Sequence, residues 1–430
     1  MHNYILENVN KTRCTLSGKA NNHMLFISIP MAHRVITKVC FSLLMLVVSV
    51  LVVGTNLGEC SSFRSENKAK DKSTLKLSAP VEEGISHLLT ALTVKTEEFD
   101  ASKVKGLIQF VENSKPTDKL IEIPKRESAS GAAMRMDIKA SLARILEYTY
   151  NPEIPNYAIY PSVIRLSGWD PKSEFYADKV QPWKYLEDSD VPKVWRGKEF
   201  EVNTPDSFGG AYYRYDLNRL LVLMKYEGRN VFLSVARQDD KSSVGMKGLV
   251  MDDSQWNYFY SGIPGLTAGG MGWMDTFMYD SISVSVYIQD DKNPDDTVFY
   301  LFKWLRAGWA GLNVVRPKHI FEGSQRFASS FRGLMESKNL PEPAVFAEEV
   351  KSIEGLSDLK IDTFISEYAK SIEDLASKNP VLSDKFPEVY EDGKYADSFT
   401  REERIGILVK EYVKRAMGKQ CLIYEKVVQN

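Results

Sequence analysis

The middle of the chain has the composition of a β-sheet. All seven tryptophans of the 430-residue sequence lie in the stretch from 156 to 315, where turn residues recur at short intervals. Aromatic and β-branched residues favour strands. Two such runs, Leu217–Tyr226 and Asn230–Arg237, flank a turn at residues 227–229 and predict a hairpin. Sequential hairpins with short connections indicate an antiparallel sheet.

A second hairpin is predicted further along the chain. The stretch Ser281–Gln289 alternates strictly between two sets of side chains, which strand geometry places on opposite faces. One face carries Ile282, Val284, Val286 and Ile288, and the other carries Ser281, Ser283, Ser285 and Tyr287. This pattern predicts a half-buried strand. Residues 290–296 then turn it into a further strand over Thr297–Arg306.

Helical periodicity occurs on both sides of this region. Ala132–Tyr150 is predicted as a helix because its apolar residues recur on one face, and an Asn-Pro pair follows it. A second amphipathic helix is expected from His319 to Glu336, and a third around Ile361–Leu375. Thr400 and Glu403 have the spacing of a capping box, which opens a further helix near the C-terminus.

The N-terminal region indicates export. The apolar run Val39–Val53 follows Arg34 and Lys38 and precedes small residues, which is the pattern of a secretory signal peptide or an N-terminal anchor. Met31 is a natural start for such a signal. Residues 1–30 are therefore interpreted as an extension that results from a wrongly assigned start site. We expect the periplasm or cell envelope as the location, with membrane anchoring if the segment is uncleaved. Lipidation at Cys60 is not expected, because Glu59 occupies the position before it, where a small residue is required.

Several kinds of chemistry are disfavoured by composition and by missing motifs. The net charge of −2 and pI of about 6.3 lack the basic excess of nucleic-acid-binding proteins. The sequence contains only five histidines and no phosphate-binding loop, nucleophile elbow or zinc-protease motif. Residues 291–296 resemble a calcium loop, but Asp296 stands where the sharp turn needs glycine. We therefore expect no cofactor and no metal, and we assign no catalytic residue.

The order of elements resembles the START-like helix-grip superfamily over about residues 132–338. The resemblance depends on two stretches, Ile145–Tyr160 and Trp304–Leu334, which lie on either side of the predicted sheet. It implies a curved antiparallel sheet that wraps a long C-terminal helix, with a hydrophobic ligand between them. Residues 171–208 are longer and more loop-like than this pattern implies.

The predicted fold class is α+β: an aromatic-rich antiparallel sheet packed on a long helix, with helical segments at both ends. Residues 1–60 are the signal or anchor, and 61–80 form a polar tether. Residues 81–131 form a helical N-terminal segment, 132–338 the helix-grip-like domain and 344–430 a C-terminal helical region. An ordinary α+β domain without a cavity remains the alternative.

The expected function is non-catalytic binding of a lipid or other hydrophobic ligand in the cell envelope. Trp304 and Arg306 share one strand face, which places aromatic surface near a cation, as a lipid tail beside an acidic head requires. The predicted ligand-binding residues are Trp304, Arg306, Trp309, Phe327, Phe331, Leu334 and Trp273. One alternative is a hydrolase or lyase that uses carboxylates and tyrosines in the same cleft. Another is an assembly protein whose C-terminal helices dock a protein partner.

We predict that residues 31–75 direct export. Fused to a reporter enzyme that is active only outside the cytoplasm, this segment should give activity, because its basic start and apolar core match a signal sequence. Replacing Cys60 by serine should leave membrane fractionation unchanged. A silent reporter contradicts export, and a fractionation change in the Cys60→Ser variant contradicts the interpretation of that cysteine as unmodified.

Overall fold

A computed structural model describes residues 74–94, 98–207, 210–268, 272–378 and 395–424. The predicted signal region and most of the tether lie outside these residues. These described residues form one compact unit. Across the described ranges, no helix is both long enough and apolar enough to cross a membrane.

The largest element is an antiparallel sheet. Within the described chain it has eight strands in the order β1-β2-β13-β12-β7-β6-β4-β3, and each neighbouring pair is antiparallel. Together with the helices it places the protein in the α+β class, as predicted. The strands are β1 (Ile121–Arg126), β2 (Ala129–Ile138), β3 (Ile164–Trp169), β4 (Lys193–Asn203), β6 (Arg214–Tyr226), β7 (Arg229–Gln238), β12 (Phe277–Gln289) and β13 (Thr297–Gly308).

Shorter strands that lie between those of the main sheet in the sequence form two further groups. A three-stranded group has the order β5-β8-β9, and β10 pairs with β11. Their bounds are β5 (Ala211–Tyr212), β8 (Met246–Asp252), β9 (Asn257–Pro264), β10 (Leu266–Ala268) and β11 (Gly272–Met274).

Both predicted hairpins are confirmed. Tyr226 pairs with Arg229, so the first turn has two residues, Glu227 and Gly228, with φ of 50° and 78°. Two positive φ values are what a type I′ turn needs to follow the twist of the strands. In the second hairpin β12 and β13 are paired from Gln289 and Thr297 down to Phe277 and Gly308.

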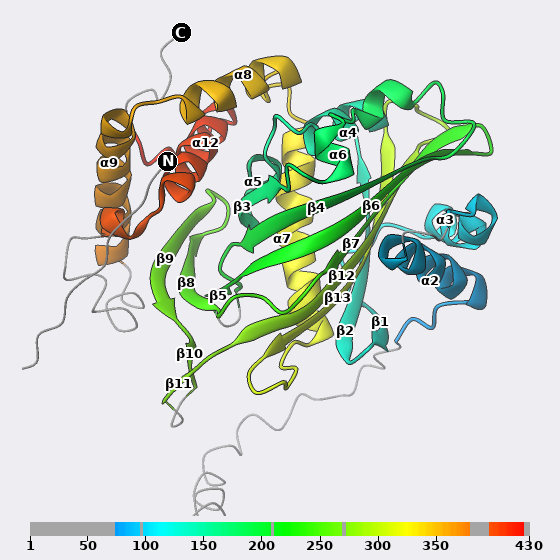
Figure 1. The fold of residues 1–430 in the computed structure, drawn as a ribbon, viewed down its shortest axis with the longest axis horizontal. Coiled ribbons are helices and arrows are strands. Elements are labelled where there is room, and N and C mark those ends of the chain that lie inside the picture. The colour runs from blue at the N-terminus through cyan, green and yellow to red at the C-terminus, as the bar shows by residue number, and fades with distance from the viewer. Residues whose placement is uncertain (1–73, 95–97, 208–209, 269–271, 379–394, 425–430) are drawn as a thin grey trace, which may run out of the picture. The chain divides into compact units, whose positions relative to one another are not determined.

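Helices cover both faces of the sheet (Figure 1). One face packs against α2 (Ala79–Thr93) and α3 (Lys105–Asn113), which a short helix η1 (Ala101–Val104) connects. The core on this side includes the apolar positions Ile282 and Val284 of β12. The other face packs against α7 (Pro317–Met335), which follows β13 in the chain and contacts β2, β13 and β1.

The prediction that β12 is half-buried is therefore wrong. Its serine face lies beneath α7, and Ser281 is only 2% exposed. Serine is common on solvated faces, so the alternation alone indicated one covered face. The second face is covered by α7, a later segment of the chain that the pattern of β12 itself does not reveal.

The predicted helix over Ala132–Tyr150 is only half right. Its first part is strand β2, which pairs with β1 and β13, and helix α4 (Leu142–Thr149) begins only after Ser141. The mixture of alanine, methionine and isoleucine fits a strand buried on both faces as well as it fits a helix. Pairing on both edges decides between the two, because tertiary context overrides intrinsic propensity.

A C-terminal helical layer completes the unit. Its helices are α8 (Pro343–Glu354), α9 (Asp358–Ser377), η3 (Tyr395–Ser398) and α12 (Arg401–Ala416). The capping box is confirmed: the Thr400 amide donates to Glu403 Oε2 at 2.8 Å, and the Glu403 amide donates to Thr400 Oγ1 at 3.3 Å. Helix α12 packs against β3 and the short helix α5 (Asn156–Ile159), so its apolar face joins the core on the α7 side of the sheet.

The predicted loop-like stretch 171–208 contains a helical turn, α6 (Glu174–Ala177), a 3-10 turn, η2 (Pro182–Tyr185), and the whole of strand β4. Only part of it is therefore irregular.

Candidate functional site

A cavity of about 300 Å³ lies between the sheet and α7. Strands β12 and β13 provide its floor through the side chains that point towards α7, and α7 contributes His319, Ile320, Gly323, Ser324, Arg326 and Phe327. Residues from β3, β4, β6 and the segments around α4 and α5 complete the wall.

Small side chains in the middle of the sheet create this space. One row across the sheet runs from Lys303 through Ser283 and Ala236 to Arg219, because these residues are register partners on adjacent strands. Directly paired residues share a face. Serine and alanine are too short to reach a helix about 10 Å away, the usual distance between packed layers. The side chains in this row therefore leave open space between the sheet and α7.

Aromatic rings close one end of the cavity. Tyr287 and Phe299 are register partners on β12 and β13, with ring centroids 4.7 Å apart. Phe299 lies 5.7 Å from Phe327 of α7, which in turn lies 5.3 Å from Tyr160. The sheet and the helix are thus in direct contact here, and this end is apolar apart from the tyrosine hydroxyls.

The polar wall centres on an arginine that two carboxylates share. Arg219 Nε donates to Glu199 Oε1 at 2.6 Å, and Arg219 Nη2 lies 3.8 Å from Glu201 Oε1. Tyr215 donates its hydroxyl hydrogen to Glu201 Oε2 at 2.8 Å. Burial raises the pKa of Glu199 to about 7, against the attraction of Arg219. Proximity to Glu201 raises it further, because one guanidinium serves two acids.

A lysine stands at the other side of the floor. Lys303 Nζ donates to Ser281 Oγ at 2.8 Å across the β12–β13 pair. Burial lowers the pKa of Lys303, and the nearby carboxylate of Glu201 opposes this shift. An ammonium group in such a position is able to bind an anion that enters the cavity.

Among the predicted ligand-binding residues whose side chains the structure describes, Phe327 is the one that lines this cavity. Phe331 stacks on Phe327 at 5.3 Å but is fully buried in the core, as is Leu334 further along α7. The sequence correctly placed the three on one helix, yet only the first borders the open volume.

Trp304 lies on the opposite face of the sheet from the cavity. It is 1% exposed, belongs to the core beneath α2 and α3, and donates Nε1–H to the Pro124 carbonyl at 2.8 Å. The guanidinium of Arg126 lies 5.0 Å from its ring. Because successive side chains of a strand point to opposite faces, the neighbouring Lys303 lines the cavity instead.

Arg306 and Trp309 also lie apart from the cavity lining. The Arg306 guanidinium lies 5.1 Å from the Tyr279 ring and donates to the Gly311 carbonyl at 2.7 Å. Trp309 is half-buried in the turn after β13. Trp273 is in strand β11, and its side chain lies outside what the structure describes.

Sequence reasoning missed the polar lining. Lys303 and Arg219 lie in strands that the sequence predicts from their apolar residues, and Glu201 lies in β4, inside the stretch that is predicted as loop-like. The sequence also places the three serines of β12 on its less buried face. The available signal was Tyr287, a large aromatic residue on the serine face, which indicated that something covers that face.

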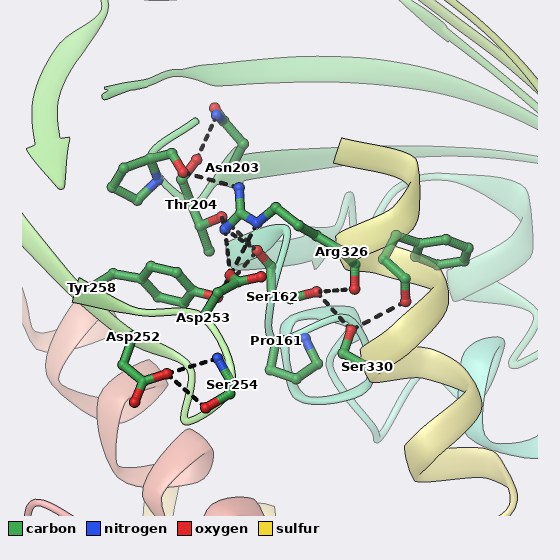
Figure 2. A network of polar contacts seen from close by, with 12 residues as sticks. Pro161, Ser162, Asn203, Thr204, Asp252, Asp253, Ser254, Tyr258, Arg326 and Ser330 are labelled. Atoms are coloured by element: carbon green, nitrogen blue, oxygen red, sulfur yellow. Dashed lines mark hydrogen bonds and ion pairs between the residues drawn. The ribbon is translucent and has the colours of Figure 1, made fainter. Parts of the chain in front are cut away.

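A second group of polar contacts, drawn in Figure 2, surrounds Arg326, which also lines the cavity. Arg326 Nε donates to Asp253 Oδ1 at 3.0 Å, and Nη2 donates to the Ser162 carbonyl at 2.8 Å. The Ser162 hydroxyl also lies 2.6 Å from that of Ser330. Arg326 also borders a second cavity of about 420 Å³, which Asp253, Trp256 and Lys419 help to line. The network fastens α7 to the β8–β9 turn, and Arg326 lines both cavities.

Comparisons with known proteins give no relative: no family model, no curated protein and no solved structure matches this chain. In the described residues no cluster of His, Cys, Asp or Glu has the arrangement of a metal site. The functional assignment therefore depends on the geometry of the cavity.

We predict that Arg326→Met destabilises the fold by about 2–4 kcal/mol, because Asp253 and two carbonyls each lose a charged donor in a half-buried place. Arg332→Met on the exposed side of the same helix is the matched control and should change stability by about 0.5 kcal/mol or less. Urea unfolding measures both. Equal effects of the two substitutions contradict the anchoring role of Arg326.

The raised pKa of Glu199 gives a pH dependence with a definite sign. Between the ordinary pKa of 4.5 and about 7, the unfolded chain has released this proton while the folded chain retains it. Wild-type stability therefore falls as the pH rises through this window. Glu199→Gln removes the titration, so its melting temperature should rise relative to wild type between about pH 5 and pH 7.5. Glu348→Gln, at an exposed position on α8, is the control. A constant or falling difference for Glu199→Gln refutes the assignment.

Proposed function

We propose that this is an exported cell-envelope protein that binds a lipid or another amphipathic molecule in the cavity between the sheet and α7. The observation that carries the proposal is the lining of that cavity, aromatic at one end and charged at the other. Its volume of about 300 Å³ lies at the lower end of the range for small-molecule sites, roughly 300–1,000 Å³. Apolar walls with a few convergent polar groups are the usual form of such sites.

The arrangement of sheet and helix supports a helix-grip interpretation. Strand β13 leads within a few residues into α7, and α7 packs on the face of the sheet that carries the cavity. This is where the resemblance to the START-like superfamily implies a ligand. Helices α2 and α3 on the opposite face, and the C-terminal layer, are additions to that scheme.

A second candidate function is catalysis by carboxylates and tyrosines in the same cavity. It is favoured by the pair Glu199 and Glu201, one of which has a pKa near neutrality. However, Glu199 is buried behind the wall and bonded to Arg219, while Glu201 accepts from Tyr215. Groups that are already paired with one another suit a rigid binding wall better than proton transfer to a substrate.

We predict that Gly323→Leu abolishes ligand uptake without loss of stability. Gly323 lines the cavity, and a Cβ atom added there meets nothing within 4 Å. The leucine side chain should therefore fill the open volume. The exchange also removes a glycine from a helix interior, which favours folding by up to about 1 kcal/mol. Native mass spectrometry before and after organic extraction, together with uptake of a fluorescent fatty acid, measures occupancy.

Gly333→Leu is the matched control. Gly333 lies in the same helix with no atom within 4 Å of an added Cβ, but it borders the second cavity. It should bring a similar gain in helix stability and leave uptake unchanged. Uptake that persists in Gly323→Leu, or that is lost only in Gly333→Leu, contradicts the assignment of the ligand to the cavity under α7.

A further inference from the structure

The charge of Lys303 is not balanced by an ion pair. Throughout the described part of the chain, its ammonium group has one hydrogen bond, to Ser281, and no carboxylate within 4.0 Å. The two arginines of the same lining are matched: Arg219 with Glu199 and Glu201, and Arg326 with Asp253. An ammonium group offers three donors, so two remain for another partner.

Hydroxyl groups extend this donor set along β12. Ser283 is the register partner of Lys303, and Ser285 follows on the same face, paired with Leu301. Both serines line the cavity, and neither hydroxyl has a hydrogen-bond partner within the described residues. A partly buried cation without an ion-pair partner is costly. A cation beside two available hydroxyls is therefore suited to a small oxyanion, which takes charge-assisted hydrogen bonds.

The apolar end of the cavity lies at a fixed distance from this cation. Lys303 and Phe299 are on the same face of β13 four residues apart, which corresponds to about 13 Å at ~3.3 Å per residue. A ligand whose head reaches Lys303 and whose tail reaches the ring of Phe299 therefore has the length of a medium-chain acyl group.

We propose that the cavity selects a medium-chain carboxylic acid, whose carboxylate binds Lys303, Ser283 and Ser285 and whose tail packs against Phe299 and Phe327. This inference rests on the proposed function, because it names the chemical class of the ligand in the same cavity. It differs from the sequence-based expectation in the cation, since Arg306 lies outside the cavity and Lys303 takes its place.

The test compares decanoate with decanol, which have the same tail and differ in the charge of the head. Calorimetric titration of the full chain near neutral pH should give at least a tenfold lower Kd for decanoate. Lys303→Met should abolish this preference while decanol binds as before. Lys303→Arg retains the charge and should keep the preference. Lys198→Met is the control, because it removes the same charge from an exposed position on β4.

The possible results separate the two proposals. Equal affinity of the wild type for decanoate and decanol overturns the carboxylate inference but leaves a hydrophobic site in place. A preference for decanoate that survives Lys303→Met also overturns it. Absence of binding for both compounds, with no ligand released from the purified protein on extraction, removes the proposed function itself. The wild-type comparison needs no variant, so a misfolded substitution does not block the test.

Discussion

A sheet covered on both faces needs large apolar side chains on both, and strand β12 meets this condition on only one of them. Its even-numbered positions from Ile282 to Ile288 fill the core beneath α2 and α3. Its odd-numbered positions are serines up to Tyr287, and these leave the space beneath α7 unfilled. Because its side chains alternate between the two faces, β12 contributes to a solid core on one side and to the floor of a cavity on the other.

Helix α7 stays in place over this gap because it is held at its ends. Near its N-terminus, Ser130 donates its hydroxyl hydrogen to the Val315 carbonyl at 2.7 Å. Near its C-terminus, Arg144 donates to the Met335 and Ser337 carbonyls at 3.0 and 3.1 Å. Arg326 fastens its side to the β8–β9 turn. These polar contacts, with the aromatic cluster around Phe327, replace the packing that the middle of the sheet does not provide.

The sequence predicted those features whose signals are local. Three examples are the turn at Glu227 and Gly228, the helix predicted over His319–Glu336 and the capping box of Thr400. Each depends on residues that are near neighbours in the chain. Strand β2 was missed because its edges are satisfied by β1 and β13, which no local pattern records.

The misplacement of Trp304 has the same kind of cause. The alternation of β13 is clear in the sequence, but which of its two faces meets α7 depends on which helices cover each side. The tryptophan suggested a binding surface because aromatic residues often form one. The structure places the tryptophan in the solid core, and its neighbour Lys303, which the sequence analysis does not single out, lines the cavity.

The polar floor links stability to occupancy. An empty cavity lowers stability because the atoms that line it lack packing partners, and this one also holds a cation with no ion pair among the described residues. Water satisfies the hydrogen bonds but does not pack against Phe299 and Phe327. An amphipathic molecule with a negative head does both. Because such a molecule binds only the folded chain, its affinity adds directly to the free energy of unfolding, so the same serines that weaken the empty fold stabilise the loaded one.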